Sequence, residues 1–189
     1  MANWAETAYA IEGPKETLQT IYEAIMHHDV EEGSSPNWEG NVLKALKPEW
    51  NSEGVSIRGF LCEDEPWWDE KGSLRFYATE AWGVTEFDEE LKKIFPDIKV
   101  YWISDETGCE YFETNDRDKK YFKSRFFLVC SFDSEYYEDG GFETEEAVYD
   151  YIREISKGKV RSKKEAEQFN DKQGESSDDF VYVYSYNVV

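Results

Sequence analysis

One carboxylate of this sequence could act as a general acid or base. Residues 73–82 predict a strand whose alternate side chains share one face. Glu80 lies on the same face as Leu74, Phe76, Ala78 and Trp82. If that face packs inward, burial would raise the pKa of the Glu80 carboxyl, as it does at general-acid sites. A place at a strand end near water, or a structural pairing with an arginine, is the competing interpretation.

Two neighbouring tryptophans, Trp67 and Trp68, lie in an acidic segment, 63–70, that we expect to form a loop. An exposed tryptophan ring can stack on a sugar or on a side chain of a partner. Neighbouring residues of an extended chain face opposite ways, so one ring could instead anchor the loop in the core. Carbohydrate binding by both rings is therefore one hypothesis, and it requires the rings to be coplanar and exposed.

The sequence carries no motif for a metal ion, a phosphate group or a nucleophilic triad. Its two histidines, His27 and His28, are adjacent at a predicted helix end, and it contains no C-x-x-C pair. Histidine is favoured at the negative, C-terminal end of a helix dipole, which is a sufficient explanation for the position of both histidines. Neither a glycine-rich phosphate loop nor an EF-hand loop is present. We expect no metal site and no cofactor, so an enzyme of this sequence would be metal-independent.

The net charge restricts the choice of partner. The chain has 42 acidic and 21 basic residues, which gives a net charge of −21 at pH 7. Such a field repels phosphate backbones and anionic membranes, so direct nucleic-acid binding and membrane adhesion are disfavoured. Solubility alone is one sufficient explanation of this charge in a chain rich in aromatic residues. The more specific interpretation is a surface that meets a basic partner or imitates nucleic acid.

A short basic segment is a candidate docking patch. It follows the stretch 133–146, which holds seven acidic residues and no basic one. The basic residues are Lys157, Lys159, Arg161, Lys163 and Lys164. They could dock an acidic partner or the acidic face of a second copy, and a solvated surface is the alternative.

The cysteines and the apolar runs indicate where the protein resides. Cys62, Cys109 and Cys130 are odd in number and widely spaced, which argues against a disulfide framework and favours a reducing compartment. No basic and apolar leader is evident, and no apolar run approaches the ~20 residues of a membrane-spanning helix. We expect a cytoplasmic protein.

Apolar spacing predicts the elements of the first hundred residues. In chain order they are strand 5–11, helix 15–28, a short helix capped by Asn41, strands 55–62 and 73–82, a helix after a capping box of Thr85 and Asp88, and strand 98–104. The order strand, helix, strand, strand, helix, strand is typical of a ferredoxin-like, split βαβ fold. We expect an antiparallel sheet with helices on one face.

The second half predicts further strands and helices. They are strands 110–114 and 121–132, helix 145–156 capped by Thr144, a short helix from Ser162 to about Phe169, and a last strand over 180–188. We expect a single α+β domain over 1–189, with a ferredoxin-like core in 1–104 and a β-rich extension in 105–189.

The opening Met1-Ala2-Asn3-Trp4, followed by a strand, Gly13-Pro14 and an amphipathic helix, resembles a family of small bacterial proteins of unassigned activity. Segments 79–101, 108–109, 114–116 and 121–122 are also similar to its members. This Met-Ala-Asn-Trp family is often borne by phages or plasmids and resembles the YubB-type ferredoxin-like domain. Ala5 stands where the family usually has cysteine. The resemblance implies a ferredoxin-like fold and a cytoplasmic, mobile-element setting, but no activity and no functional residue.

Together these features favour a non-enzymatic, acidic accessory protein that binds another macromolecule. The expected partner is a protein, and self-association is possible on the same grounds. One alternative is a metal-independent enzyme that uses Glu80 as acid or base in a cleft lined by Trp82. Carbohydrate binding through Trp67 and Trp68 is a further alternative.

Overall fold

The computed structural model describes residues 3–30, 33, 35–173 and 178–189. It is a mixed α+β structure with two sheets, which confirms the α+β class. The chain divides into two compact units, Met1–Asp116 and Arg117–Val189, which we call the N-terminal and the C-terminal unit. Each unit has a hydrophobic cluster of its own. The expectation of a single domain over 1–189 stays a prediction.

The N-terminal unit contains one antiparallel sheet. Its elements are β1 (Trp4–Glu12), α1 (Lys15–His27), α2 (Glu39–Leu46), β2 (Gly59–Leu61), β3 (Trp67–Trp68), β4 (Leu74–Ala81), α3 (Phe87–Ile94), β5 (Lys99–Glu106), a 3₁₀ turn (Thr107–Cys109) and β6 (Tyr111–Thr114). Within this unit the strand order is β6-β5-β1-β4-β2, and β3 pairs with β4. β1 is therefore a central strand, between β4 and β5.

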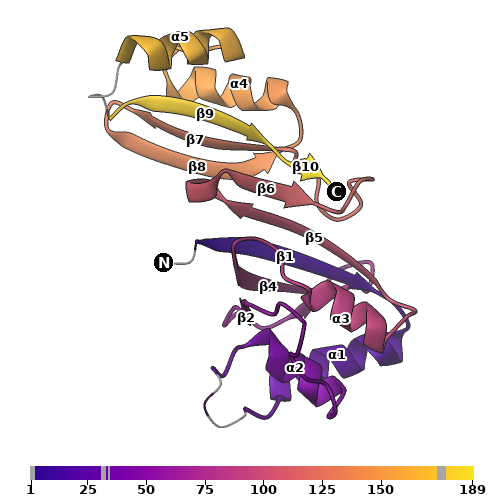
Figure 1. Ribbon diagram of the computed structural model, residues 1–189. Coiled ribbons are helices and arrows are strands. Elements are labelled where there is room, and N and C mark those ends of the chain that lie inside the picture. The colour runs from indigo at the N-terminus through magenta and orange to yellow at the C-terminus, as the bar shows by residue number, and fades with distance from the viewer. Residues whose placement is uncertain (1–2, 31–32, 34, 174–177) are drawn as a thin grey trace. The chain divides into compact units, whose positions relative to one another are not determined.

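The three helices of this unit cover one face of the sheet (Figure 1). Tyr9 and Ile11 of β1 face them, together with Leu74 and Phe76 of β4, and pack against Leu18 and Ile21 of α1. The Tyr9 ring stacks on Phe76, its partner across the strands, at 4.9 Å between centroids. Alternate residues of β1, such as Glu6 and Ala8, lie on the other face, as period-two spacing requires.

The predicted helix 15–28 and the strand 73–82 are confirmed, with small differences at their ends. The predicted strand 55–62 is wrong in extent, because only Gly59–Leu61 pairs with β4. The capping box of Thr85 and Asp88 is also wrong. Helix α3 begins at Phe87, and its N-cap residue is Glu86, whose side chain makes no capping hydrogen bond. The Thr85 hydroxyl accepts from the Phe87 N–H at 3.4 Å and also lies against two buried carboxyl groups.

The C-terminal unit contains a second antiparallel sheet of order β8-β7-β9. The elements of this unit are β7 (Phe126–Phe132), β8 (Glu135–Phe142), α4 (Glu145–Ile155), α5 (Lys163–Gln173), β9 (Phe180–Ser185) and β10 (Asn187–Val188). Helices α4 and α5 lie on one side of this sheet (Figure 1) and close a core around Leu128, Val148 and Ile152. Thr144 accepts a hydrogen bond from the Ala147 N–H (3.2 Å), which confirms the predicted cap of α4.

Three predictions for this unit need correction, and one of its strands was not predicted. Strand β8 was missed, because its acidic sequence is exposed at most positions and so has no apolar alternation. The predicted strand 121–132 begins only at Phe126, and helix α5 extends beyond Phe169 to Gln173. The predicted strand 180–188 is interrupted at Tyr186, which is buried whereas Tyr182 is exposed.

The outer edge of β9 is covered at one residue by a side chain of α5. The Asn170 amide donates to the Val181 carbonyl (2.8 Å), and the Val181 N–H donates to Asn170 Oδ1 (2.9 Å). Asn170 thus satisfies both main-chain groups that point away from β7, as a neighbouring strand would.

We expect Asn170→Ala to destabilise the C-terminal unit by about 1–3 kcal/mol, because two half-buried main-chain groups lose their partner. The measurement is hydrogen exchange of amides in β7 and β9. Gln168→Ala, an exposed change in the same helix, is the control. Equal effects of the two substitutions would contradict a specific role for the Asn170 amide.

Candidate functional site

Glu80 lies in β4 with its side chain wholly buried (0% exposed). Its neighbours across the strands are Ala5 of β1 and Gly59 of β2, two residues that leave space above the sheet. Three donors converge on Glu80 Oε1: the Tyr9 hydroxyl at 3.0 Å, and the N–H and hydroxyl of Thr85 at 2.9 Å each. Glu80 is therefore the centre of a buried polar cluster between the sheet and the helices.

Trp82 does not line this cluster, so the expected face shared by Glu80 and Trp82 is wrong. β4 ends at Ala81, and Trp82 has a positive φ of 63° followed by Gly83 at 103°. This turn breaks the period-two alternation and leaves Trp82 60% exposed. The guanidinium of Arg58 lies over its ring, 5.3 Å from the centroid.

A second carboxyl group, which the sequence analysis missed, completes the cluster. Glu39, the first residue of α2, is also wholly buried. Its Oε2 lies 3.0 Å from Thr85 Oγ1, the same hydroxyl that contacts Glu80. The Glu39 carboxyl sits directly on Gly59 of β2, where a Cβ atom would collide with it.

The electrostatics of this cluster oppose ionisation. Burial raises the pKa of Glu39 well above its ordinary value, and the charge of Glu80 raises it further. Burial also raises the pKa of Glu80, although interactions with Thr7, Thr85 and Tyr9 partly oppose this. The pKa of Tyr9 is raised by burial and by the same two carboxyls. Because Glu39 and Glu80 expose no surface, neither can touch a substrate in this conformation.

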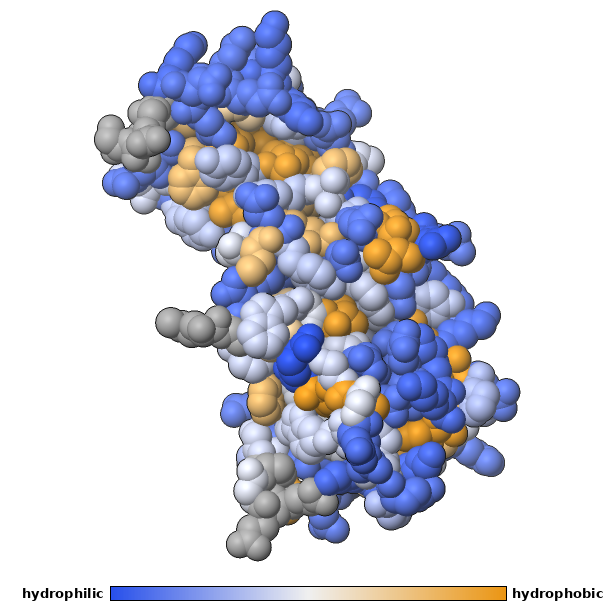
Figure 2. Space-filling view, in the orientation of Figure 1, coloured by the Kyte–Doolittle hydropathy of each residue, from blue (hydrophilic) through white to orange (hydrophobic). Residues whose placement is uncertain are grey.

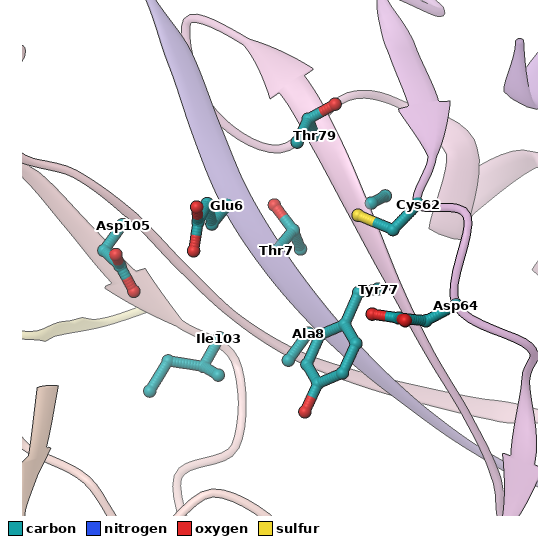
Figure 3. Close-up of a pocket in the computed structure, with 10 residues that line it drawn as sticks. Glu6, Thr7, Ala8, Cys62, Asp64, Tyr77, Thr79, Ile103 and Asp105 are labelled. Atoms are coloured by element: carbon teal, nitrogen blue, oxygen red, sulfur yellow. The ribbon is translucent and has the colours of Figure 1, made fainter. Parts of the chain in front are cut away.

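The opposite face of the sheet carries a pocket of ≈ 480 Å³ (Figure 3). Glu6 of β1 lies between its strand neighbours Thr79 and Asp105, and all three line the pocket. Ala8 lies in the same way between Tyr77 and Ile103, and its small side chain leaves the hollow. The lining residues are Glu6, Thr7, Ala8, Cys62, Asp64, Tyr77, Ala78, Thr79, Ile103 and Asp105.

This pocket is acidic. Carboxylates come from three separate segments, as Glu6, Asp64 and Asp105, and the described lining residues include no lysine, arginine or histidine. The same charges act on the thiol at the rim. Partial burial raises the pKa of Cys62, and the charges of Asp64 and Glu6 raise it further. The thiol is thus held in its protonated form, which is unsuited to nucleophilic attack.

The two tryptophans of β3 face opposite sides of the sheet. Trp67 contacts Tyr77 beside the acidic pocket, at 5.2 Å between ring centroids. Trp68 stacks instead on Tyr22 of α1, at 5.8 Å. Both tryptophans are partly exposed, at 37% and 39%, but they do not form the single coplanar platform that joint carbohydrate binding requires.

The basic segment 157–164 is partly neutralised within the C-terminal unit. Lys157 and Lys159 both pair with Asp133, at 3.4 and 2.8 Å, and these contacts hold the pKa of Asp133 below its usual value. The Arg161 guanidinium donates to the Gly158 carbonyl (3.2 Å). Lys163 and Lys164 begin α5, whose outer surface is hydrophilic (Figure 2).

The histidines are not gathered with other metal-binding side chains. His28 lies at the end of α1, with its ring nitrogens 3.0 Å from the Ala24 carbonyl and 2.6 Å from the Pro36 carbonyl. Among the described residues, no group of three or more His, Cys, Asp and Glu side chains could hold a metal ion. Within the same residues, no helix has the length and apolar character needed to cross a membrane.

Comparison of the chain with protein-family models, with curated proteins and with solved structures finds no match in any of the three. The acidic pocket and the buried carboxyl cluster are therefore the two candidate sites of this chain.

We expect Gly59→Ala to destabilise the N-terminal unit by about 1–3 kcal/mol, because the added Cβ meets the Glu39 carboxyl in a filled site. Denaturant unfolding followed by tryptophan fluorescence measures this effect, since all seven tryptophans belong to this unit.

The cost should be smaller when Glu39 is already alanine, because the collision is then relieved. If Gly59→Ala costs the same in both backgrounds, the contact between Gly59 and Glu39 is not its cause.

Proposed function

We propose that this protein is a non-enzymatic binding module whose N-terminal unit receives basic side chains of a protein partner on the open face of its sheet. The observation that supports this most directly is the acidic pocket, with Glu6, Asp64 and Asp105 around a hollow floored by Ala8. The whole chain reinforces the field, because its net charge is −21. Such a field attracts a basic partner from a distance and fixes its orientation on contact.

The aromatic rings beside the pocket suit the same ligand. Tyr77 is 44% exposed, and Trp67 lies against it on the open face. Arginine and lysine side chains bind the faces of such rings through cation–π contacts while their charged ends reach carboxylates. A segment bearing arginine could therefore place its aliphatic stem over Tyr77 and its guanidinium among the carboxylates.

We also infer that the N-terminal unit has the ferredoxin-like topology. The strand order β5-β1-β4-β2, with every neighbour antiparallel, supports it. The chain passes from β1 through α1 and α2 to β2, and from β4 through α3 to β5. β3 and β6 are then additions to this frame. The resemblance to the Met-Ala-Asn-Trp family agrees with this fold and with an accessory role on a mobile element.

The enzymatic alternative has less support from the geometry. Glu80 has the titratable neighbours Glu39 and Tyr9, but all three are wholly buried. Trp82 is on the surface beside Arg58 rather than beside Glu80. An acid or base must come within hydrogen-bond reach of the substrate, which this arrangement does not allow.

The test is a titration with a hexa-arginine peptide, followed by calorimetry and by tryptophan fluorescence. We expect binding that weakens with salt, and a loss of about tenfold in affinity for Glu6→Gln/Asp64→Asn, since two exposed charge contacts are removed. The matched control is Glu23→Gln/Glu89→Gln, which makes the same change in net charge at exposed positions of α1 and α3.

The control should leave affinity within about twofold of the unchanged protein, because its charges are remote from the pocket. Equal losses in both double variants would show general attraction to an acidic protein. No loss in Glu6→Gln/Asp64→Asn would contradict the proposed site.

A further inference from the structure

We propose that Glu39 and Glu80 hold a single proton between them through the Thr85 hydroxyl, and that this proton keeps helix α2 closed on the sheet. The inference does not depend on the binding function proposed above. It concerns the opposite face of the N-terminal unit, where both carboxyls are wholly buried.

The hydrogen-bond geometry requires the proton. Thr85 Oγ1 lies 3.0 Å from Glu39 Oε2 and 2.9 Å from Glu80 Oε1, but a hydroxyl has only one hydrogen to donate. If both carboxyls were ionised, one of these two contacts would join acceptors only. A proton on one carboxyl makes both contacts hydrogen bonds, because that carboxyl then donates to Oγ1 while Oγ1 donates to the other.

The remaining contacts place this proton on Glu39. Glu80 Oε1 already accepts from the Tyr9 hydroxyl and from the Thr85 N–H, and these hydrogen bonds stabilise the ionised form of Glu80. Within the described part of the chain, the buried Oε1 of Glu39 has no hydrogen-bond partner. The chain of donation is therefore from Glu39 to Thr85 to Glu80.

No basic group among the described residues offsets the two carboxyls. The titratable groups that face them are Tyr9 from β1, Asp88 from α3 and Tyr111 from β6. Asp88 is itself paired with Lys92 at 3.0 Å. Oε2 of Glu80 and Oε1 of Glu39 both lack hydrogen-bond partners within the described residues. A second ionisation would thus place two negative charges side by side in a dry site.

The proton is tied to α2 because Glu39 is the first residue of that helix. Its carboxyl lies on Gly59 of β2 and is held to the segment between β4 and α3 through Thr85, and to β4 through Glu80. When Glu39 ionises, its proton passes to solvent and its donation to Thr85 is lost. Repulsion from Glu80 then drives the start of α2 away from the sheet.

The direction of the pH effect follows from the proton count. Unfolded glutamate ionises near its ordinary pKa of about 4.3, whereas the folded pair retains a proton to higher pH. Between these limits the folded state binds more protons than the unfolded state, so stability falls as pH rises. Below about pH 4 both states hold this proton, so stability no longer depends on pH through it and its stabilising contribution is fully present.

The test compares the protein with Glu39→Gln, whose amide can donate to Thr85 Oγ1 but cannot ionise. The unfolding constant of the N-terminal unit is measured by tryptophan fluorescence from pH 4 to pH 9. We expect the unfolding constant of the unchanged protein, divided by that of the variant, to rise with pH by up to about tenfold per pH unit. The ratio should become constant above the pKa of Glu39 in the folded protein. Glu89→Gln, an exposed glutamate of α3, should give a ratio that does not change with pH.

Two further measurements use the unchanged protein and so do not require Glu39→Gln to fold. In the unchanged protein labelled with ¹³C-glutamate, one side-chain carboxyl carbon should still have the chemical shift of a protonated carboxyl group at pH 6.5. Hydrogen exchange of α2 amides, after correction for the intrinsic rate, should accelerate with pH in the unchanged protein.

Carboxyl signals that are all ionised at pH 6.5 would overturn the proposal. So would stabilisation by added Ca²⁺ or Mg²⁺ that saturates and disappears in Glu39→Gln, because a cation rather than a proton would then join the two carboxyls.

Discussion

The alternation of side chains along the central strand β1 is the constraint on which both sites depend. Tyr9 and Ile11 face the helices, and Glu6 and Ala8 face the open side. Antiparallel pairing with β4 and β5 then fixes which residues join each of them. A shift of one residue in the register of β1 with β4 would move Glu80 to the open face, and a shift in the register of β1 with β5 would turn Asp105 towards the core. Core packing around Tyr9 therefore also holds the pocket in place.

Much of the fold could be predicted from apolar spacing. Helix α1, strand β4 and the Thr144 cap of α4 were predicted, because each has a local pattern or a local hydrogen bond. Strand β8 could not be predicted, since an exposed, acidic edge strand has no apolar alternation. The turn before it uses positive φ at Asp133 and Ser134, residues that do not signal such a turn as Asn-Gly does.

The sites were harder to predict because their residues meet only through tertiary structure. Strand alternation placed Glu80 among apolar residues, but nothing in the sequence pairs it with Glu39, which is 46 residues from the shared Thr85. Thr85 was given a capping role from its local spacing, whereas the buried carboxyls compete for its hydroxyl. The pocket likewise joins Glu6, Asp64 and Asp105 from three distant segments. Local sequence patterns carry no information on such tertiary contacts.

The separation of the two sites bears on the choice between catalysis and binding. Catalytic pockets bring groups with shifted pKa values into contact with the substrate. In this unit burial raises the pKa values of Tyr9, Glu39 and Glu80, and these groups have no exposed surface. The pKa of Cys62, which lines the pocket, is also raised, but this holds the thiol in its unreactive protonated form. The carboxylates that a partner can reach, such as Glu6 and Asp64, lie across the sheet from the three buried groups. Because the sheet divides the groups suited to proton transfer from the surface suited to a ligand, this arrangement favours recognition over chemistry.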